Sequence, residues 1–429
     1  MSSRIHSIIS REILDSRGMP TLETTVILES GYRGTASVPA GASIGKYEAV
    51  ELRDRDQKRY NGMGVLKAVD NVVNVIGLKL RGMDSMKQRE IDNTLLALDG
   101  SPNKQRLGSN SLLSVSLSVS VAAAAQEHMP LFKYINTIFG GSLHTSIERM
   151  PTPIFNLING GLHGGRNLNF QEFHVVPATN ISYRDCLRMG EEIYTAARIV
   201  LDSRNFSHAV GDEGGYAPNL YANLEALEIL IEAIRLTSYK FGVEIFLGLD
   251  VAAAQCKTER GYEIKDHPTP MTTNDFIKFL ADLHKTYRLL ILEDALVEDD
   301  WAGWKQLTTL IGSEIHIVGD DFLATNVERL RKAISEHACT AILCKPNQIG
   351  TLTEYFEVIR LAKANDIKCI VSHRSGETND TFIADLAVGL QADYVKFGAP
   401  ARGERVAKYN RLLAIESELF PESKRFTIN

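Results

Sequence analysis

Residues 245–250 read Ile-Phe-Leu-Gly-Leu-Asp, residues 289–293 read Leu-Leu-Ile-Leu-Glu, and residues 315–320 read Ile-His-Ile-Val-Gly-Asp. Each segment is almost wholly apolar and ends on an acid, which is Asp250, Glu293 or Asp320. Apolar runs of four to six residues are typical of strands that are buried on both faces, as in a parallel sheet. These three segments therefore predict buried parallel strands with a carboxylate at each carboxyl end.

Three further apolar runs follow the same rule, and they stop at Lys345, His373 and Lys396. Successive end residues, starting from Asp250, are 43, 27, 25, 28 and 23 positions apart. A spacing of about 25 residues accommodates one strand, one helix and two loops. A repeated strand–helix unit with a reactive group at each strand end predicts an (α/β)8 barrel whose active site lies at the carboxyl ends of the strands.

The chain of 429 residues is longer than one barrel requires. A barrel takes about 250 residues, so a second domain is expected. We expect a smaller α+β domain at residues 1–140 and the barrel at residues 141–429, with Gly140, Gly141 and Ser142 at the boundary.

Three strands and several helices are expected in the first domain. Residues 5–13, 21–28 and 34–38 are rich in β-branched side chains and are separated by turn residues. Apolar residues at helical spacing indicate helices near residues 65–76 and 91–98. In residues 111–125, leucine or valine alternates with serine. That pattern alone favours a strand, although the alanines that follow favour a helix.

Composition excludes several classes of protein. The net charge of −6 gives no basic surface for nucleic acid or for a membrane. Leu112 to Ala125 is too short and too rich in serine to span a bilayer, and the first residues lack the apolar core of a signal peptide. The five cysteines show no metal-binding spacing, so buried thiols in a reducing compartment are expected. These features predict a cytoplasmic protein.

Asp250, Glu293 and Asp320 are the strongest candidates for a metal site. Carboxylate oxygens from three strand ends suit Mg²⁺, which prefers such ligands over imidazole or thiolate. A single acid of this kind is more often a helix cap or one half of an ion pair. Three buried together would cost several kcal/mol each unless a cation compensated them.

Basic and hydroxyl side chains at the next strand ends suggest proton transfer and anion binding. Lys345 is a candidate general base, because burial and a nearby cation would both lower its pKa, and Lys396 is a candidate for binding an anion. Arg374 and Ser375, beside His373, suit the oxygens of a phosphate or a carboxylate. Each lysine could instead make a structural ion pair, and Arg374 could be a satisfied structural arginine.

Acids and polar residues before the barrel repeats give weaker signals. Glu213 lies in the glycine-flanked segment 211–215, where it could act as an acid or a base, or could lie in an exposed turn. Gln171, Glu172 and His163 are weak candidates alone, since a lone histidine is more often structural than catalytic.

Longer motifs in the same places resemble the enolase family almost end to end. They are Asp15 to Gly18, Gly41 to Ser43, Asn159 to Gly161, Gln171 to Phe173, Gly211 to Asn219, Val318 to Asp321, Lys345 to Gly350, and Ser372 to Thr378. The last two are long and highly specific.

The resemblance implies a three-stranded sheet with helices, a barrel of order ββαα(βα)₆, and a helix at residues 111–125. It implies two Mg²⁺ per active site, one held by Asp250, Glu293 and Asp320, and a second that joins with substrate and is held in part by Ser43 on a closing loop at residues 41–48. Lys345 would be the base and Glu213 the acid, with Glu172 and His373 also in the catalytic group. Substrate would contact Ser43, His163, Gln171, Glu172, Lys345, His373, Arg374, Ser375 and Lys396. A homodimer, or a higher homo-oligomer, is also implied.

The chain departs from the family pattern at positions beside these groups. The differing residues are Ala40, Ile44, Leu162, His174, Ala254, Gln255, Cys256 and Phe397. They put turnover, loop closure and metal affinity in question more than reaction type.

The expected activity is the magnesium-dependent, reversible dehydration of 2-phosphoglycerate to phosphoenolpyruvate, in glycolysis and gluconeogenesis. Two alternatives remain open at this stage. One is a dehydratase or racemase of the same superfamily that acts on another acid. The other is a homologue of low activity with a separate role as a scaffold or surface receptor.

Overall fold

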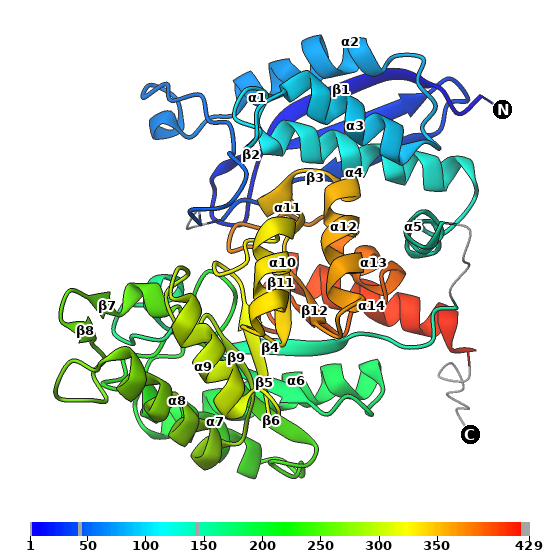
Figure 1. Cartoon of the computed structure of the whole chain (residues 1–429). Coiled ribbons are helices and arrows are strands. Elements are labelled where there is room, and N and C mark those ends of the chain that lie inside the picture. The colour runs from blue at the N-terminus through cyan, green and yellow to red at the C-terminus, as the bar shows by residue number, and fades with distance from the viewer. Residues whose placement is uncertain (1, 42–44, 142–145, 422–429) are drawn as a thin grey trace, which may run out of the picture.

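The chain folds into a small sheet-and-helix unit that lies against one end of an eight-stranded barrel (Figure 1). The computed structural model describes residues 2–41, 45–141 and 146–421. The predicted fold class, an α/β barrel preceded by a smaller α+β unit, is confirmed.

The N-terminal sheet is antiparallel, with its three strands in sequence order. The strands are β1 (Ile5–Leu14), β2 (Pro20–Leu28) and β3 (Arg33–Ser37), which agrees with the three expected from sequence. The accompanying helices are α1 (Leu66–Asp70), α2 (Gly77–Leu80), α3 (Gln88–Asp99), α4 (Ser109–Gln126) and α5 (Leu131–Gly140). Residues 71–76, between α1 and α2, form a π-helical turn.

The alternation of serine with apolar residues favoured a strand at residues 111–125, and that prediction is wrong, because these residues lie within α4. The helix is buried on nearly all sides, so its sequence shows no polar face. Several of its buried serines donate to backbone carbonyls, as when the Ser118 hydroxyl donates to Ser114 and Thr24 at 2.6 and 2.8 Å, whereas Ser116 donates to the carboxylate of Asp92 at 2.7 Å. A serine satisfied in this way can face the core at any helical position, which removes the usual periodicity.

The barrel is closed by eight strands in the order β10–β11–β12–β13–β4–β5–β6–β9. All neighbouring pairs are parallel except those that β5 makes, which are antiparallel. The strands are β4 (Thr152–Asn159), β5 (Glu172–Pro177), β6 (Ile245–Asp250), β9 (Leu289–Glu293), β10 (His316–Gly319), β11 (Ala341–Cys344), β12 (Lys368–Ser372) and β13 (Tyr394–Lys396).

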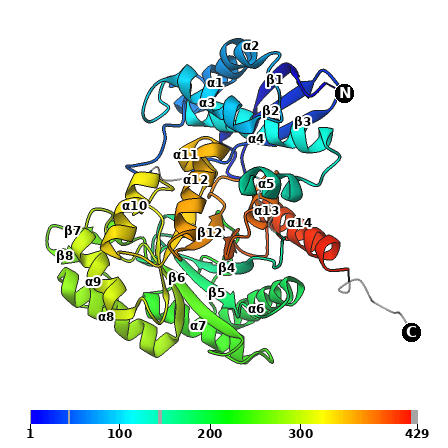
Figure 2. The ribbon, with the colours of Figure 1, turned by 45° about the vertical axis from the view of Figure 1, so that its right-hand side comes forward.

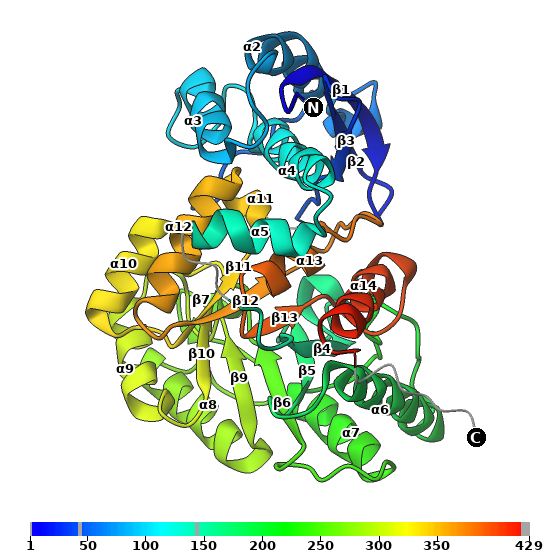
Figure 3. The same ribbon diagram turned by 90° about the vertical axis from the view of Figure 1, so that its right-hand side faces the viewer.

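Helices surround the barrel in the ββαα(βα)₆ order that the resemblance implied (Figure 3). A two-stranded ribbon, β7 (Lys257–Thr258) and β8 (Gly261–Tyr262), is inserted after β6. The helices are α6 (Tyr183–Ser203), α7 (Asn223–Arg235), α8 (Thr273–Tyr287), α9 (Trp301–Ile311), α10 (Val327–Glu336), α11 (Pro346–Ile349), α12 (Leu352–Lys363), α13 (Phe382–Gly389) and α14 (Gly403–Leu419).

Side chains fill the barrel interior below the strand ends. A compact apolar cluster takes residues from different strands, including Ile291, Val318, Leu343 and Tyr394. Each of these lies two positions before a polar strand-end residue. Because side chains alternate across a strand, the polar group and the apolar one point to the same face. The interior is therefore a packed core that supports a polar layer at the carboxyl ends.

The N-terminal unit lies against one end of the barrel (Figure 2), and its Glu48 contacts Arg374 beside the cavity. Ala40 exchanges backbone hydrogen bonds with Gly376 at 2.8 and 2.9 Å. The Ser37 amide donates to Asp380 at 2.7 Å, and the buried Asp92 of α3 accepts from the Thr353 amide and hydroxyl at the start of α12. We propose that the domain boundary lies at residues 140 and 141, as the sequence suggested. No helix in the described part of the chain is both long and apolar enough to cross a bilayer.

Gly34→Ala should destabilise the protein, because β3 lies directly against α4 at this position. A Cβ on Gly34 would be 2.1 Å from the Ala122 nitrogen and 2.3 Å from the Ser118 carbonyl oxygen, both in the backbone. Overpacking of this kind costs about 1–3 kcal/mol or more in the free energy of unfolding. Urea denaturation measures the loss.

Gly403→Ala is the matched control, since a Cβ at that position meets nothing within 4 Å. Its unfolding midpoint should stay at or slightly above that of the parent protein. Equal stability of the two variants would contradict the close packing of β3 on α4.

Candidate active site

The reactive side chains named from sequence meet at one mouth of the barrel. Asp250, Glu293 and Lys396 end their strands, while Lys345 and His373 directly follow theirs. A cavity of about 140 Å³ opens there. Its lining contains nearly all the predicted site residues: His163, Gln171, Glu172, Glu213, Asp250, Asp320, Lys345, His373, Arg374, Ser375 and Lys396. Ser43 and Ile44 lie outside the described residues.

Lys396 is surrounded by carboxylates. Its Nζ lies 2.8 Å from Glu172 Oε2, 2.8 Å from Glu293 Oε2 and 3.9 Å from Asp250 Oδ2. Burial opposes the charge, but these acids raise the pKa of Lys396 well above its usual value. Glu293, which does not line the cavity itself, is tied to it through this ammonium group.

One ammonium group does not neutralise three acids. Burial and the neighbouring carboxylates raise the pKa of Asp250 to about 7 and that of Glu293 to about 8, although Lys396 opposes the shift. Only Glu172, which also has two histidine partners, has a pKa well below its usual value. If all three acids were ionised, this side of the site would carry more negative charge than its lysine compensates, and burial together with that repulsion makes Asp250 and Glu293 hold their protons more strongly.

Lys345 pairs with Asp320 at 2.5 Å between Nζ and Oδ2. The sequence led us to expect a lowered pKa for Lys345. Burial does act in that direction and is the largest single effect, but attraction to the neighbouring acids, Asp320 foremost and Glu293 after it, exceeds it in sum and the pKa is raised. Gln348 donates to the other oxygen of Asp320 at 3.2 Å, which fixes the carboxylate in place.

Two acids that the sequence analysis did not select add to the negative charge. Asp294 and Asp321 follow Glu293 and Asp320, and the ligand atoms of Asp294, Asp320 and Asp321 lie within 4.8 Å of one another. The predicted trio of Asp250, Glu293 and Asp320 is not among the groups that meet this distance in the described chain. The sequence did contain a signal for Asp294 and Asp321, because each directly follows a predicted acid at a strand end.

The donor set of this region fits a divalent cation. Its ligand atoms are carboxylate oxygens, and no cysteine lines the cavity among the described residues. Burial raises the pKa of Asp321 to about 6, and repulsion from Asp320 adds to the shift. A hard divalent ion would relieve that repulsion with the oxygen ligands that it prefers. Asp250, Glu293 and Asp320, with Asp294 and Asp321 beside them, are the residues available to hold it.

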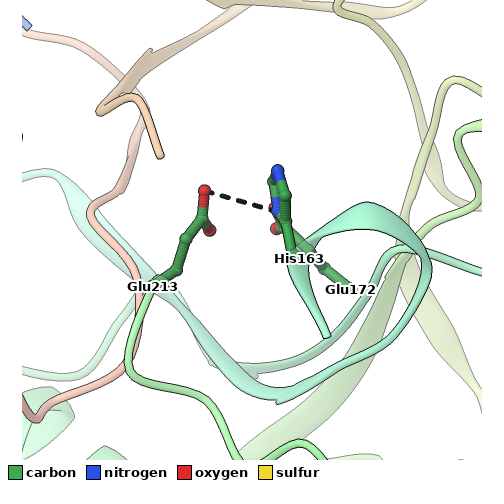
Figure 4. Close-up of side chains that lie close together, drawn as sticks. All are labelled: His163, Glu172 and Glu213. Carbon is green, nitrogen blue, oxygen red and sulfur yellow. Dashed lines mark hydrogen bonds and ion pairs between the residues drawn. The ribbon is translucent and has the colours of Figure 1, made fainter. Parts of the chain in front are cut away.

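A second group of titratable side chains contains His163, Glu172 and Glu213 (Figure 4). His163 Nδ1 lies 3.0 Å from Glu172 Oε1 and 3.4 Å from Glu213 Oε1. Burial would lower the pKa of His163, but the two acids raise it to about 9. Glu213 is buried beside Glu172, which raises its pKa, yet His373 and His163 lower it to about 2. Near neutral pH, His163 is therefore protonated and Glu213 is ionised.

His174 gives Glu172 a partner that the sequence analysis did not foresee. Its Nε2 lies 2.8 Å from Glu172 Oε2. The two residues are two positions apart on β5, so both point into the barrel. Glu172 is held by His163 on one oxygen and by His174 and Lys396 on the other. A histidine two residues beyond a candidate acid on a strand was the signal for this contact.

Arg374, the candidate for phosphate binding, is bound to a carboxylate of the N-terminal unit. Its guanidinium donates to Glu48 Oε2 at 2.9 Å and to Glu48 Oε1 at 3.2 Å. Tyr47 and Lys46 anchor the same segment to Asp299, at 2.7 and 2.9 Å. Residues 45–48 are therefore docked on the barrel with an acid at the predicted anion site.

Two of the departures from the family pattern, Leu162 and Gln255, line the cavity. Leu162 is 42% exposed and lines its mouth, whereas Phe397 is fully buried against Tyr409. Gln255 donates to Gln171 at 2.6 Å, and Gln171 donates to Asp250 at 3.1 Å. These differences alter the surroundings of the predicted groups and leave the groups themselves at the mouth of the barrel.

Two family models match the chain. The model described as enolase, N-terminal domain, matches residues 5–135, and the model described as enolase, C-terminal TIM barrel domain, matches residues 147–427. The second match alone covers more than half of the chain.

Mg²⁺ should stabilise the folded protein through the acids at the strand ends. A ligand that binds only the native state adds about 2.7 kcal/mol when present at 100 times its Kd. We expect the melting temperature to rise with Mg²⁺ concentration, and the rise to be largely lost in Asp320→Asn. Differential scanning fluorimetry after chelation measures both.

Asp282→Asn is the control, because Asp282 is an exposed residue of α8. It should respond to Mg²⁺ as the parent does. A full response in Asp320→Asn would place the ion elsewhere.

Proposed function

The chain belongs to the enolase family, and we propose that it catalyses the reversible, Mg²⁺-dependent dehydration of 2-phosphoglycerate to phosphoenolpyruvate. The observation that carries the proposal is the division of the site into two groups. Lys345 pairs with Asp320 at the acidic strand ends. Glu213 lies instead among His163, His373 and Asn156. A β-elimination needs such a pair, with a base for one carbon and an acid for the group that leaves the next.

Lys345 is the proposed base for the proton at C2. Its ammonium must first lose a proton, which burial favours and the ion pair with Asp320 opposes. General acid–base catalysis supplies about 10²–10⁴-fold, too little alone for so weak a carbon acid. A divalent ion held by Asp250, Glu293 and Asp320 would stabilise the negative charge that develops on the substrate carboxylate.

Glu213 is the proposed acid for the 3-hydroxyl. At a pKa of about 2 it is ionised in the free protein and must receive a proton before it can donate one. His163 is protonated, and its Nδ1 lies 3.4 Å from Glu213 Oε1. Transfer from His163 to Glu213 prepares the acid, and transfer from Glu213 to the hydroxyl releases water. Glu172, held on both oxygens, keeps His163 in place.

Arg374 and Ser375 are proposed to bind the phosphate. A guanidinium offers several donors in one plane, and Arg374 already directs two toward the oxygens of Glu48. A phosphate would compete with Glu48 for these donors or would share them. Ser43 is proposed, from the family resemblance alone, to help hold a second Mg²⁺. A homodimer and a cytoplasmic location remain predictions from the sequence.

The activity can be tested directly with purified protein. In the presence of Mg²⁺, 2-phosphoglycerate should produce a steady rise in ultraviolet absorbance as phosphoenolpyruvate forms, and chelation should abolish the rise. Hydroxy acids that lack the phosphate should give no elimination product by NMR. Turnover of such an acid, with none of 2-phosphoglycerate, would identify a different dehydratase.

The roles of Lys345 and Glu213 separate in an isotope experiment. Lys345→Ala should abolish exchange of the C2 hydrogen with solvent deuterium, because it removes the base. Glu213→Gln should retain exchange and lose dehydration by about 10²–10⁴-fold, the range for one acid or base. NMR of 2-phosphoglycerate in D₂O measures the exchange. Retention of exchange in both variants would show that the base is another residue.

A further inference from the structure

A buried arginine outside the cavity contacts the imidazole of His373. Arg405 lies near the start of α14 and is fully buried. Its Nη1 lies 2.6 Å from His373 Nδ1 and donates to the Arg374 carbonyl at 2.6 Å. Its Nη2 donates to the carbonyls of Ser375 and Asp212, at 2.7 and 3.1 Å. One guanidinium thus joins the segment that carries Glu213 to the segment that carries His373 and Arg374.

The contact with His373 has only one chemical reading. A guanidinium donates hydrogen bonds and cannot accept them, and it stays charged at every relevant pH. Nδ1 of His373 must therefore offer its lone pair, which leaves Nε2 to carry the proton of the neutral ring. We propose that Arg405 is a positioning residue that fixes His373 as this neutral tautomer and presents its Nε2–H to the active site.

The other side of the ring faces the proposed acid. His373 lines the cavity, and its Nε2 lies 3.1 Å from Glu213 Oε2. Nε2 makes no hydrogen bond of good geometry to the residues that the structure describes. It is a buried donor that can form a hydrogen bond to a ligand hydroxyl or carboxylate. A small rotation of the side chain would also let it donate to Glu213.

This tautomer limits the role of His373 in the proposed reaction. This limit rests on the proposed function. A second proton on the ring would have to enter at Nδ1, where Arg405 Nη1 lies at 2.6 Å. His373 therefore acts as a hydrogen-bond donor and does not store the proton that is passed to the leaving hydroxyl. That proton belongs to the group of Glu213 and His163.

The charges around His373 agree with this protonation state. Burial and Arg405 lower the pKa of His373, while Glu213 and Glu172 act in the opposite direction. The net shift is downward, which favours the neutral ring. Removing the arginine charge would raise this pKa and make the ring a cation in mild acid.

The tautomer can be read in the ligand-free protein without any turnover. In protein labelled with ¹⁵N-histidine, the His373 signals are assigned by their loss in His373→Gln. We expect Nδ1 at the shift of an unprotonated nitrogen and Nε2 at that of a protonated one, with no change as pH is lowered to 6. A proton on Nδ1 would overturn the proposal, whether or not the protein dehydrates 2-phosphoglycerate.

Two substitutions of Arg405 provide a second test through the pH profile. Arg405→Gln removes the charge, so the acid limb of kcat should move upward by about one pH unit as His373 becomes protonated. Arg405→Lys keeps a charged donor and should leave the limb near its original position. Both variants disturb the carbonyl contacts, so a purely structural role would affect them alike.

Arg411→Gln serves as the control, since Arg411 is on the same helix and pairs with Asp385. It should leave the profile unchanged. An unshifted acid limb in folded Arg405→Gln would overturn the proposal. If that variant does not fold, the ¹⁵N shifts of the parent and of Arg405→Lys decide the question, with an Nδ1 proton in either one overturning it.

Discussion

The buried negative charge at the mouth of the barrel is the constraint on which the rest of the site depends. Seven carboxylates line or adjoin the cavity, namely Glu172, Glu213, Asp250, Glu293, Asp294, Asp320 and Asp321. Lys345 and Lys396 offset only part of that charge, while Arg374 is paired with a further acid, Glu48. Such a group is costly to bury without a compensating cation, and the acids at these strand ends could hold a metal ion. The raised pKa values of Asp250 and Glu293 express that imbalance.

Much of this arrangement could be predicted from the sequence, because barrel geometry links position in the chain to position in space. Asp250, Glu293, Asp320, Lys345, His373 and Lys396 each end an apolar run, and parallel strands bring such ends together. The N-terminal strands followed from β-branched runs between turns. α4 did not, since its all-round burial removed the periodicity on which a helix prediction depends.

The remaining features arise from contacts between distant segments, which no local pattern encodes. Glu48 reaches Arg374 across 326 positions, and Arg405 reaches His373 across 32. The direction of the pKa shift of Lys345 also depends on a contact between distant segments. The sequence indicates that the lysine is buried, but only the 2.5 Å distance to Asp320 shows that attraction outweighs burial.

The reversed direction of β5 has a consequence for how this barrel can change. In a uniformly parallel barrel, new chemistry is introduced by altering the loops that follow the strands. Here Glu172 opens β5 and pairs with Asp250, which closes β6. The turn after Pro177 therefore emerges at the opposite rim, away from the cavity. Variation that reshapes this wall of the site must come from the connection between β4 and β5, the segment that holds Leu162 and His163.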